Sequence, residues 1–405
     1  MFNSTLNEPK SRIDKLQIAA LCGLMVVGAV FVFSATMVSE SAAAAAWYKQ
    51  SWFRQIVWYG IGITAGATVC LVDYRSLSRW AFVVYWFTIL LLIAVLIPGI
   101  GTTHGWGAQR WIDLGFFQFQ PSEFAKLAFI FALAHFLSRP LEELRILSNF
   151  VKALGLMALP FLLIMKEPDL GSALVLIPPG LAMLFVAGTP GRYLVRLLGG
   201  VGILGALFLV DVLFAPPNWQ VFKLEDYQAR RLMVYFGRDY DSSPNLSKAD
   251  RERKRKQQFD DSHNVRQALI SVGSGGLTGK GWRQGTQNAL GYLPRAVAHN
   301  DFIFSVIAEE KGFAGSVIVV TLYGAVLFTG IRIASQARDR LGKLLAVGVV
   351  ALLFSHVFIN IGMNIRLMPV TGVPLPLLSY GGSSVLCSLI AIGLLQNVYM
   401  HRKAY

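Results

Sequence analysis

The chain has 405 residues, of which 54% are hydrophobic and only 15% are charged. Soluble domains carry about 25% charged residues, so the composition excludes an ordinary soluble protein and predicts an all-α polytopic membrane protein. The formal net charge is +14, but no DNA- or RNA-binding motif is present. We therefore interpret the positive charge as a signal of contact with membrane lipid and of topology, not of nucleic-acid binding.

Apolar runs of about 20 residues are long enough to cross the hydrocarbon core as helices. Ten such runs are present, and two of them, 121–138 and 148–165, are short and carry charges. The first run is longer than the apolar core of a signal peptide, so we expect it to remain as an anchor. The expected spans are 16–38, 52–72, 80–98, 121–138, 148–165, 169–188, 193–214, 313–330, 344–364 and 381–399.

Lysines and arginines gather in alternate short loops, which places both termini in the cytoplasm under the positive-inside rule. The predicted organisation is a cytoplasmic N-terminus at 1–15, helices one to seven in 16–214, a long extracytoplasmic loop at 215–300, helices eight to ten in 301–399 and a cytoplasmic C-terminus at 400–405.

Two stretches of the long loop stand out. The basic run KADRERKRKQQ at 248–258 is interpreted as a solvated surface helix, with binding of anionic lipid or a partner as the alternative. The stretch SVGSGGLTGKGW at 271–282 is rich in glycine, which predicts backbone that can approach a ligand closely. It lacks the GxxxxGK[ST] pattern, so it does not indicate a nucleotide site.

Ionisable residues inside apolar spans are costly and indicate function by default. In QPSEFAKLAFIFALAHF (120–136), Glu123 and Lys126 lie three residues apart, on one helix face and close enough to pair. The pair is either a neutralising salt bridge or part of an aqueous cavity that holds a polar or anionic substrate, and both readings stay open. A lysine suits pyrophosphate as a point charge.

Two further clusters lie at the predicted outer ends of the spans. GAQRWIDLG (107–115) contains Arg110, a fork-shaped anion donor, and Trp111, which is either an interface anchor or a site residue. KEPDLGSAL (166–174) contains Lys166, another outward cation, and Asp169, which is equally suited to cap the next helix.

HNDFIF (299–304) places His299 and Asp301 where the long loop meets the eighth span. Asp301 is either a helix N-cap or a partly desolvated carboxylate with a raised pKa, as a general base requires. If 302–311 are helical, Asp301 shares a face with Ser305, Ala308 and Gly312.

The fifth cluster is MPVTGVPLPLLSYGGSS (368–384), which includes Ser379 and Gly381. Non-helical backbone at membrane depth is tolerated only when it is buried in protein or lines a cavity, so we expect this loop to form a cavity wall. All five clusters fall on the predicted outer face. That asymmetry favours chemistry on an extracytoplasmic, membrane-bound substrate.

These motifs resemble those of the SEDS family (shape, elongation, division and sporulation), in its RodA form. The resemblance runs from about residue 16 to 400 and rests on RWIDLGFFQFQPSEFAKL, KEPDLGSAL, SVGSGGLTGKG, HNDFIFSVIAEEKG and NIGMNIRLMPVTGVPLPLLSYGGSS. It implies the SEDS fold, which is related to GT-C glycosyltransferases. The implied activity is that of a peptidoglycan glycosyltransferase of the cytoplasmic (inner) membrane, which polymerises lipid II into β-1,4-linked glycan strands on the outer face during cell elongation and shape maintenance.

The resemblance also implies residue roles. The family's essential loop aspartate matches Asp301, its cavity glutamate and lysine match Glu123 and Lys126, and its tryptophan matches Trp111. We expect Asp301 to be the catalytic base, with Glu123 either orienting Lys126 or serving as the alternative base, and the nearby cations to steady the pyrophosphate. The candidate substrate-binding residues are Lys126, Arg110, Trp111, Lys166, Asp169, His299, Ser379 and Gly381.

The chain departs from the family pattern in two places: Asn300 stands where the family usually has threonine, and the preceding LPRAVA differs, which leaves the geometry of this approach loop open. No cofactor or protein metal-ligand set is implied, and a divalent cation stays open. The expected partners are lipid II, a class B penicillin-binding transpeptidase, membrane proteins of the elongation machinery and membrane lipid. The alternatives are a lipid II flippase and a non-catalytic scaffold for the transpeptidase.

Overall fold

The computed structural model describes residues 13–36, 46–102, 109–113, 115, 118–215, 221, 226–237, 248–293 and 297–403. Outside the described residues lie most of the predicted N-terminal segment 1–15, the last two residues of 400–405 and parts of the long segment 215–300. Residues 294–296 of the approach loop before His299 are among those parts.

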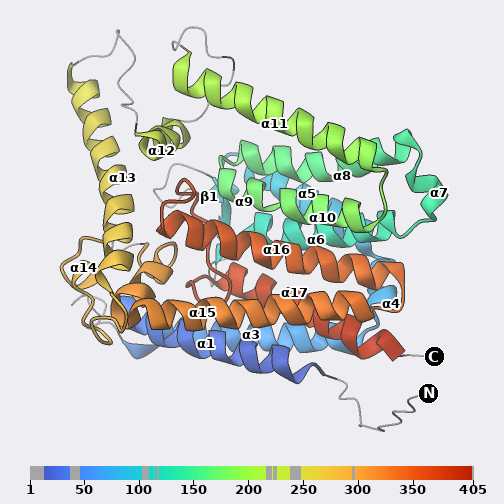
Figure 1. Ribbon diagram of the computed structural model, residues 1–405, viewed down its shortest axis with the longest axis horizontal. Coiled ribbons are helices and arrows are strands. Elements are labelled where there is room, and N and C mark those ends of the chain that lie inside the picture. Colours follow the sequence, from blue (N-terminus) through green and yellow to red (C-terminus); the bar gives the residue numbers. More distant parts are fainter. Residues whose placement is uncertain are drawn as a thin grey trace.

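Helices occupy all ten ranges predicted as spans (Figure 1). Six described helices are long and apolar enough to cross a membrane: α1, α8, α11, α15, α16 and α17. The chain is therefore a polytopic all-α membrane protein, as predicted; a membrane crossing by each of the other four stays a prediction. The helices are α1 (Lys15–Thr36), α3 (Ser51–Leu71), α5 (Ala81–Val95), α6 (Pro121–Leu137), α8 (Leu147–Lys166), α9 (Leu170–Val175) with α10 (Ile177–Val186), α11 (Gly191–Phe214), α15 (Ile303–Gln336), α16 (Arg340–Asn364) and α17 (Gly382–Met400).

Two helices differ from the prediction. The sixth predicted span is divided into α9 and α10 at Leu176, just before two prolines, which cannot donate helix hydrogen bonds. The eighth is preceded by a further helical segment: α15 starts at Ile303 and is broken at Gly312, so the part after the break begins at 313, where the span was predicted to begin. Glu309 and Glu310 are buried in the part before the break, at 0% and 1% exposure.

The two ends of the bundle carry different elements (Figure 1). The start of α1 and the end of α17 lie at one end, the terminal end, together with α4 (Tyr74–Ser78), α7 (Leu141–Leu144) and η2 (His401–Lys403). At the opposite end, the loop end, lie α12 (Asp226–Phe236), α13 (Lys248–Ser274), α14 (Thr286–Ala289) and a small antiparallel sheet. The sheet has the order β1 (Gly101–Thr102), β2 (Trp111–Asp113), β3 (Gln118–Phe119). The short helix η1 (Trp47–Lys49) precedes α3.

The predicted long loop is partly helical. The basic run 248–258 is helical, as expected, and belongs to α13, which packs against α15. Its described side chains Glu252 and Lys256 are exposed. The side of the membrane on which this segment lies stays a prediction.

Small residues let α3 and α17 pack closely. A Cβ added to Gly66 would lie 2.8 Å from the carbonyl oxygen of Leu389, and one added to Gly393 would lie 2.6 Å from the carbonyl oxygen of Gly66. Close backbone approach of this kind is how helices associate within lipid. Asn397 of α17 then donates to the carbonyls of Val69 and Val72, each at 2.6 Å, and so satisfies the end of α3.

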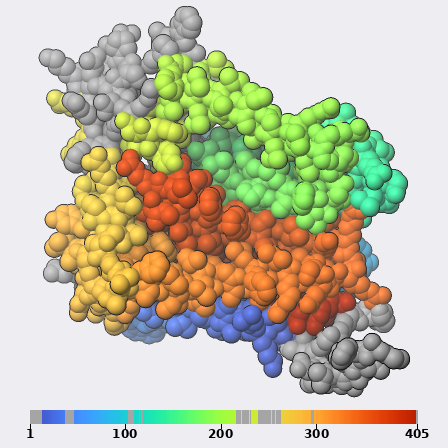
Figure 2. Space-filling model, in the orientation of Figure 1, coloured from blue at the N-terminus to red at the C-terminus, as the bar shows by residue number. Residues whose placement is uncertain are grey.

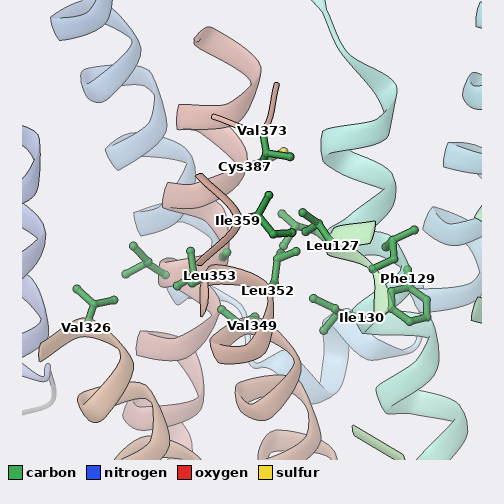
Figure 3. Packing of buried hydrophobic residues seen from close by; sticks show 14 of the residues in the cluster. Leu127, Phe129, Ile130, Val326, Val349, Leu352, Leu353, Ile359, Val373 and Cys387 are labelled. Carbon is green, nitrogen blue, oxygen red and sulfur yellow. The ribbon is translucent and has the colours of Figure 1, made fainter. Parts of the chain in front are cut away.

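The apolar core lies where α6 faces α16 (Figure 3). Leu127 and Ile130 of α6 meet Val349 and Leu352 of α16, and all four are buried. Helix α11 contrasts with this core, since only 6% of its apolar stretch is buried. Figure 2 shows a hollow between α11 and its neighbours. The outer surface of α11 is therefore suited to contact lipid.

Candidate active site

The predicted pair on α6 is formed. Pro121 opens the helix, and Lys126 Nζ lies 2.5 Å from Glu123 Oε1. The two side chains are enclosed, at 1% and 3% exposure. The pairing predicted from their spacing is therefore present, and a role in substrate binding stays a prediction.

A histidine that the sequence reasoning missed completes this cluster. His356 of α16 is buried, and its Nε2 lies 3.1 Å from Lys126 Nζ. Because an ammonium group can only donate, Nε2 must accept, so the imidazole is neutral with its proton on Nδ1. The available signal was an ionisable residue inside an apolar span.

Arg110 is held at the turn between α8 and α9. Its Nε donates to the carbonyl of Glu167 at 3.3 Å and its Nη2 donates to the carbonyl of Pro168. Its Nη1 lies 3.9 Å from Asp169 Oδ1. Asp169 also accepts from the Ser172 amide at 3.0 Å, so it is the cap of α9, one of its two predicted readings.

Glu167, in the same turn, was not singled out from the sequence. It is 0% exposed, and neither carboxylate oxygen has a hydrogen-bond partner. Burial raises the pKa of Glu167 to about 9; Asp169 raises it further and Arg110 lowers it. Glu167 is therefore protonated at neutral pH.

Asp301 lies in a turn just before α15 and is not its N-cap. The N-cap position is Phe302, and no side chain caps the helix there. The backbone carbonyl of Asp301 accepts from Asn360 Nδ2 and Asn364 Nδ2 of α16, each at 3.1 Å. Asn364 is itself bonded by Ser305 Oγ at 2.6 Å. Two asparagines of α16 therefore position the turn that carries the carboxylate.

The electrostatic surroundings of Asp301 suit a proton acceptor. Burial raises its pKa to about 6, while the charges of Arg231 and Arg110 lower it and that of Asp169 raises it. A base works best with a pKa near the operating pH. At neutral pH Asp301 is ionised and able to take up a proton.

The loop before α17 packs around this turn. Ser379 Oγ donates to the carbonyl of Asn300 at 2.5 Å and accepts from the Leu375 amide at 2.8 Å. The Tyr380 amide donates to the carbonyl of His299 at 3.0 Å, and the Gly381 amide donates to Gln55 Oε1 at 3.4 Å. His299, Ser379 and Gly381 therefore shape the approach to Asp301, and substrate contact by them stays a prediction.

A pocket opens beside this loop, so residues 369–371 do form a cavity wall as expected. Its lining residues are Arg110, Pro168, Leu170, Arg231, Leu232, Pro369, Val370 and Thr371.

Of the ten predicted site residues, which are all among the described residues, only Arg110 lines this pocket. Lys166 is exposed at the end of α8, and Trp111 is half-buried on β2, where its carbonyl accepts from Thr102 Oγ1 at 3.2 Å. Lys126 is connected to the Asp301 turn through α16. His356 contacts Lys126, and four residues later, about 6 Å along the helix, Asn360 donates to the carbonyl of Asp301. The roles of Lys166 and Trp111 stay predictions.

The glycine-rich stretch 271–282 lies against helix α15, and its approach to a ligand stays a prediction. Helix α15 is broken at Gly312, which has φ 64° and ψ −157°. The Phe313 and Ala314 amides donate to the carbonyls of Gly276 and Leu277, at 2.8 and 3.1 Å. The Lys280 and Gly281 amides donate to the carbonyls of Glu309 and Glu310, both at 3.0 Å. The backbone of this stretch therefore approaches the backbone of the broken helix closely.

In the described part of the chain, no group of three or more histidine, cysteine, aspartate or glutamate side chains is arranged to hold a metal ion. The candidate chemistry rests on a carboxylate, Asp301, which is influenced by the charges of Arg231 and Arg110. These features define the class as a polytopic membrane protein with an ionisable site at one end of its helices.

The chain belongs to the FtsW/RodA/SpoVE family: the family model, described as "Cell cycle protein", matches residues 14–404. This confirms the SEDS resemblance. Stage V sporulation protein E of Bacillus subtilis (strain 168) is 36% identical, with 96% of this chain and 97% of that protein covered. Peptidoglycan glycosyltransferase MrdB of Escherichia coli (strain K12) is 34% identical, with 97% and 95% covered.

A solved structure described as "Structural coordination of polymerization and crosslinking by a peptidoglycan synthase complex" contains a similar chain. The two chains share 27% sequence identity and superpose with a TM-score of 0.73, over 97% of this chain and 99% of the other. The helical arrangement is therefore that of a known membrane fold along nearly its whole length.

Proposed function

We propose that this protein is a peptidoglycan glycosyltransferase that polymerises lipid II into β-1,4-linked glycan strands. The observation that carries it is the carboxylate of Asp301: its pKa is raised to about 6 and its turn is fixed by α16. It lies beside a pocket that contains two arginines. The similarity to a protein named peptidoglycan glycosyltransferase supports the same activity.

Asp301 acts as the general base in a single displacement. It takes the proton of the acceptor 4-hydroxyl as that oxygen attacks the anomeric carbon of the donor sugar. The new glycosidic bond forms as the bond from the anomeric carbon to the diphosphate oxygen breaks, and the diphosphate leaves on its prenyl chain with the electron pair. Attack from the opposite face converts an α-linked donor into a β-linked product.

The cations stabilise the negative charge that develops on the leaving diphosphate. Arg110 lines the pocket and takes the direct contact. Lys126 is enclosed by Glu123 and His356, so it contributes a fixed charge from α6, beside His356 of α16. Glu123 orients Lys126 and is the alternative base.

The enzyme works at the outer face of the cytoplasmic membrane, with a class B penicillin-binding transpeptidase and the elongation machinery. The start of α1 and the end of α17 lie at the end of the bundle opposite α13 and α14 (Figure 1), and Asp301 lies just before the end of α15 that packs near α13, which supports a site outside and termini inside. The similar chain from a complex that coordinates polymerization and crosslinking supports a transpeptidase partner.

Incubation of the purified protein with labelled lipid II, with and without the transpeptidase, tests the activity. We expect glycan ladders on gels, and more of them with the partner. If the protein instead moves fluorescent lipid II across proteoliposome membranes and forms no ladders, it is a flippase. Transpeptidase binding with neither activity would leave only the scaffold.

Cysteine labelling tests the orientation. In a variant without the native cysteines, Lys256→Cys on the exposed face of α13 should react with an impermeant thiol reagent in intact spheroplasts. Ser335→Cys, exposed near the terminal end of α15, is the matched control and should react only after lysis. The opposite pattern would place Asp301 inside the cell and remove its access to an external acceptor.

A further inference from the structure

Helix α12, part of the long segment between α11 and α15, is docked onto the loop that precedes α17. Its Leu232 and Met233 are each 7% exposed. The Tyr235 hydroxyl donates to the carbonyl of Leu367 at 3.0 Å, and Arg231 Nη1 donates to the carbonyl of Val370 at 3.4 Å. Apolar burial and polar contacts together hold α12 over the site.

This docking brings Arg231 into the pocket that also contains Arg110. The two guanidinium groups come from distant parts of the chain, one from α12 and one from the segment just before β2. The other lining residues are mainly apolar: Pro168, Leu170, Leu232, Pro369 and Val370, with the hydroxyl of Thr371. The pocket therefore combines two planar cations with an apolar wall.

Gly372 leaves a space between Arg231 and Asp301. A Cβ added to Gly372 would lie 3.6 Å from Asp301 Oδ2 and 3.8 Å from Arg231 Nη1, and would meet no other described heavy atom within 4 Å. With φ at 74°, the position also favours glycine for its backbone. The carboxylate of Asp301 and the guanidinium of Arg231 thus both border the space beside Gly372.

Resting on the glycosyltransferase function above, we propose that Arg231 and Arg110 together bind the diphosphate of a prenyl-linked donor. Each planar guanidinium can bind phosphate oxygens in a bidentate way, so two of them match two phosphoryl groups. The apolar wall accommodates the first isoprene unit of the prenyl chain. Helix α12 of the long segment thereby supplies part of the donor site.

Arg231 also influences the pKa of Asp301. Three charged groups act on Asp301: Arg231 from α12, Arg110 from the segment before β2 and Asp169 from the cap of α9. Arg231 lowers the pKa of Asp301, opposing the effect of burial. Loss of Arg231 therefore raises that pKa and moves the acid limb of the activity profile to higher pH.

Ligand binding by the full-length protein in detergent tests the site without requiring turnover. The probes are farnesyl diphosphate, inorganic pyrophosphate and farnesol, each titrated while thermal unfolding is followed. We expect farnesyl diphosphate to stabilise the protein most, and Arg231→Gln to weaken its binding about 10–100-fold, the loss expected for a hydrogen bond to a charged group. Arg231→Lys should retain part of the affinity.

Lys256→Gln is the matched control, because it removes one positive charge from an exposed site on the same long segment; it should bind farnesyl diphosphate like the wild type. If Arg231→Gln does not fold, Arg110→Gln and Arg231→Lys replace it in the titrations. Equal affinity in Arg231→Gln and wild type would overturn the site. Equal binding of pyrophosphate and farnesyl diphosphate would overturn the assignment of a prenyl-linked ligand.

The two proposals fail separately. Ladders made by Arg231→Gln with an unchanged KM and an unchanged acid limb would refute the role of Arg231 and leave the glycosyltransferase intact. Absence of ladders from the wild type, with farnesyl diphosphate bound through Arg231, would refute the polymerase and leave the diphosphate site.

Discussion

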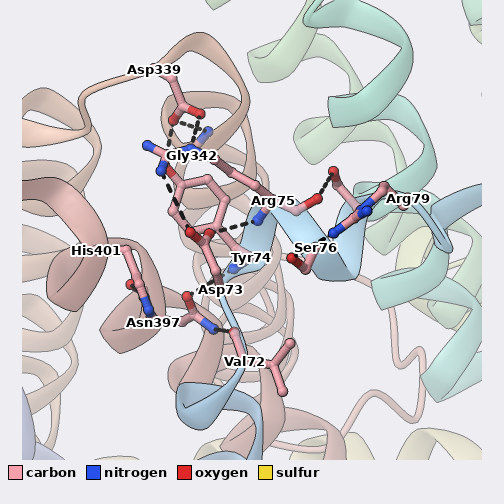
Figure 4. Close-up of polar contacts among 11 residues, drawn as sticks. Val72, Asp73, Tyr74, Arg75, Ser76, Arg79, Asp339, Gly342, Asn397 and His401 are labelled. Carbon is pink, nitrogen blue, oxygen red and sulfur yellow. Dashed lines mark hydrogen bonds and ion pairs between the residues drawn. The ribbon is translucent and has the colours of Figure 1, made fainter. Parts of the chain in front are cut away.

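The two ends of the bundle hold ionisable side chains in opposite ways. At the terminal end, Asp339 accepts from the Tyr74 hydroxyl at 2.5 Å, from Arg75 Nε at 3.0 Å and from the Gly342 amide at 3.1 Å (Figure 4). At the loop end, Glu167 is fully buried with no hydrogen bond to either oxygen. The carboxylate of Asp339 therefore has several donors, whereas that of Glu167 has none.

The pKa values follow from this difference. Burial alone would raise the pKa of Asp339, but hydrogen bonds from Tyr74 and Arg75 and from the Gly342 amide lower it below its usual range. Burial raises the pKa of Asp301 to about 6, and that of Glu167 to about 9. Saturated carboxylates stabilise the fold, whereas shifted ones in a cleft mark a site of proton chemistry.

The strongest test of this contrast is Asp301→Asn. Asparagine keeps the size of the side chain but cannot take up a proton, so polymerisation should fall by about 10²–10⁴-fold while thermal stability stays near wild type. Initial rates on lipid II measure the loss. In the wild type, the rate should decline as the pH falls through about 6, because Asp301 becomes protonated.

Asp339→Asn at the terminal end is the matched control and should retain its rate per folded molecule. Near-normal ladders from Asp301→Asn would transfer the role of base to Glu123.

The Glu123–Lys126 pair on α6 combines features of both kinds of carboxylate. Glu123 is paired, as Asp339 is, yet it lies close to the candidate site. Lys126→Met should lower the free energy of unfolding by about 3–5 kcal/mol, since it leaves Glu123 as an uncompensated buried charge. Adding Glu123→Gln should restore stability without restoring polymerisation. Unfolding curves and ladders on both variants decide the matter. Recovery of both stability and polymerisation in the double variant would show that the pair is purely structural.

Glu167→Gln tests whether the unsaturated acid is neutral. The pKa of Glu167 is about 9 in the folded protein, against an ordinary value of 4.5. Between these values the folded state holds a proton that the unfolded state has lost, so stability falls as the pH rises, by up to about 1.4 kcal/mol per pH unit. Glutamine does not titrate. The stability of the variant relative to wild type should therefore increase from pH 5.5 to 8.5, and a constant difference would show that Glu167 is ionised.

The smallest expected effect is at the terminal end. Asp14 is 2% exposed, accepts from the Gln17 amide at 3.2 Å and pairs with Arg332. Asp14→Ala should lower the free energy of unfolding by about 1–3 kcal/mol, because a helix cap and a charged hydrogen bond are lost. Thermal unfolding and the lipid II assay together check this. A large loss of rate in the folded variant would contradict a purely structural terminal end.

Local signals account for what the sequence predicted well. Apolar run length locates the helices, three-residue spacing pairs Glu123 with Lys126, and Asp169 precedes the helix that it caps. Each of these relations depends on residues within a few positions of one another. They needed no knowledge of how distant segments meet.

Contacts between distant segments account for what was missed. Arg231 lies in a polar stretch and gains its role only because α12 docks beside Arg110. Glu309 is buried inside α15, and its burial is possible because Lys280 Nζ, from the long segment, reaches it at 2.6 Å. His356 likewise becomes informative only once α16 lies against α6.

The junction between the glycine-rich stretch and the broken helix α15 has a consequence for how the gene can vary. Its hydrogen bonds join main chain to main chain, so substitution of an exposed side chain such as Leu277 leaves these bonds intact. Gly279 and Gly312 are not, because a Cβ would lie 2.2 Å from the carbonyl oxygen of Glu310 in the first case and 2.4 Å from the Gly279 amide nitrogen in the second. Across relatives, the positions of Gly279 and Gly312 should therefore remain glycine.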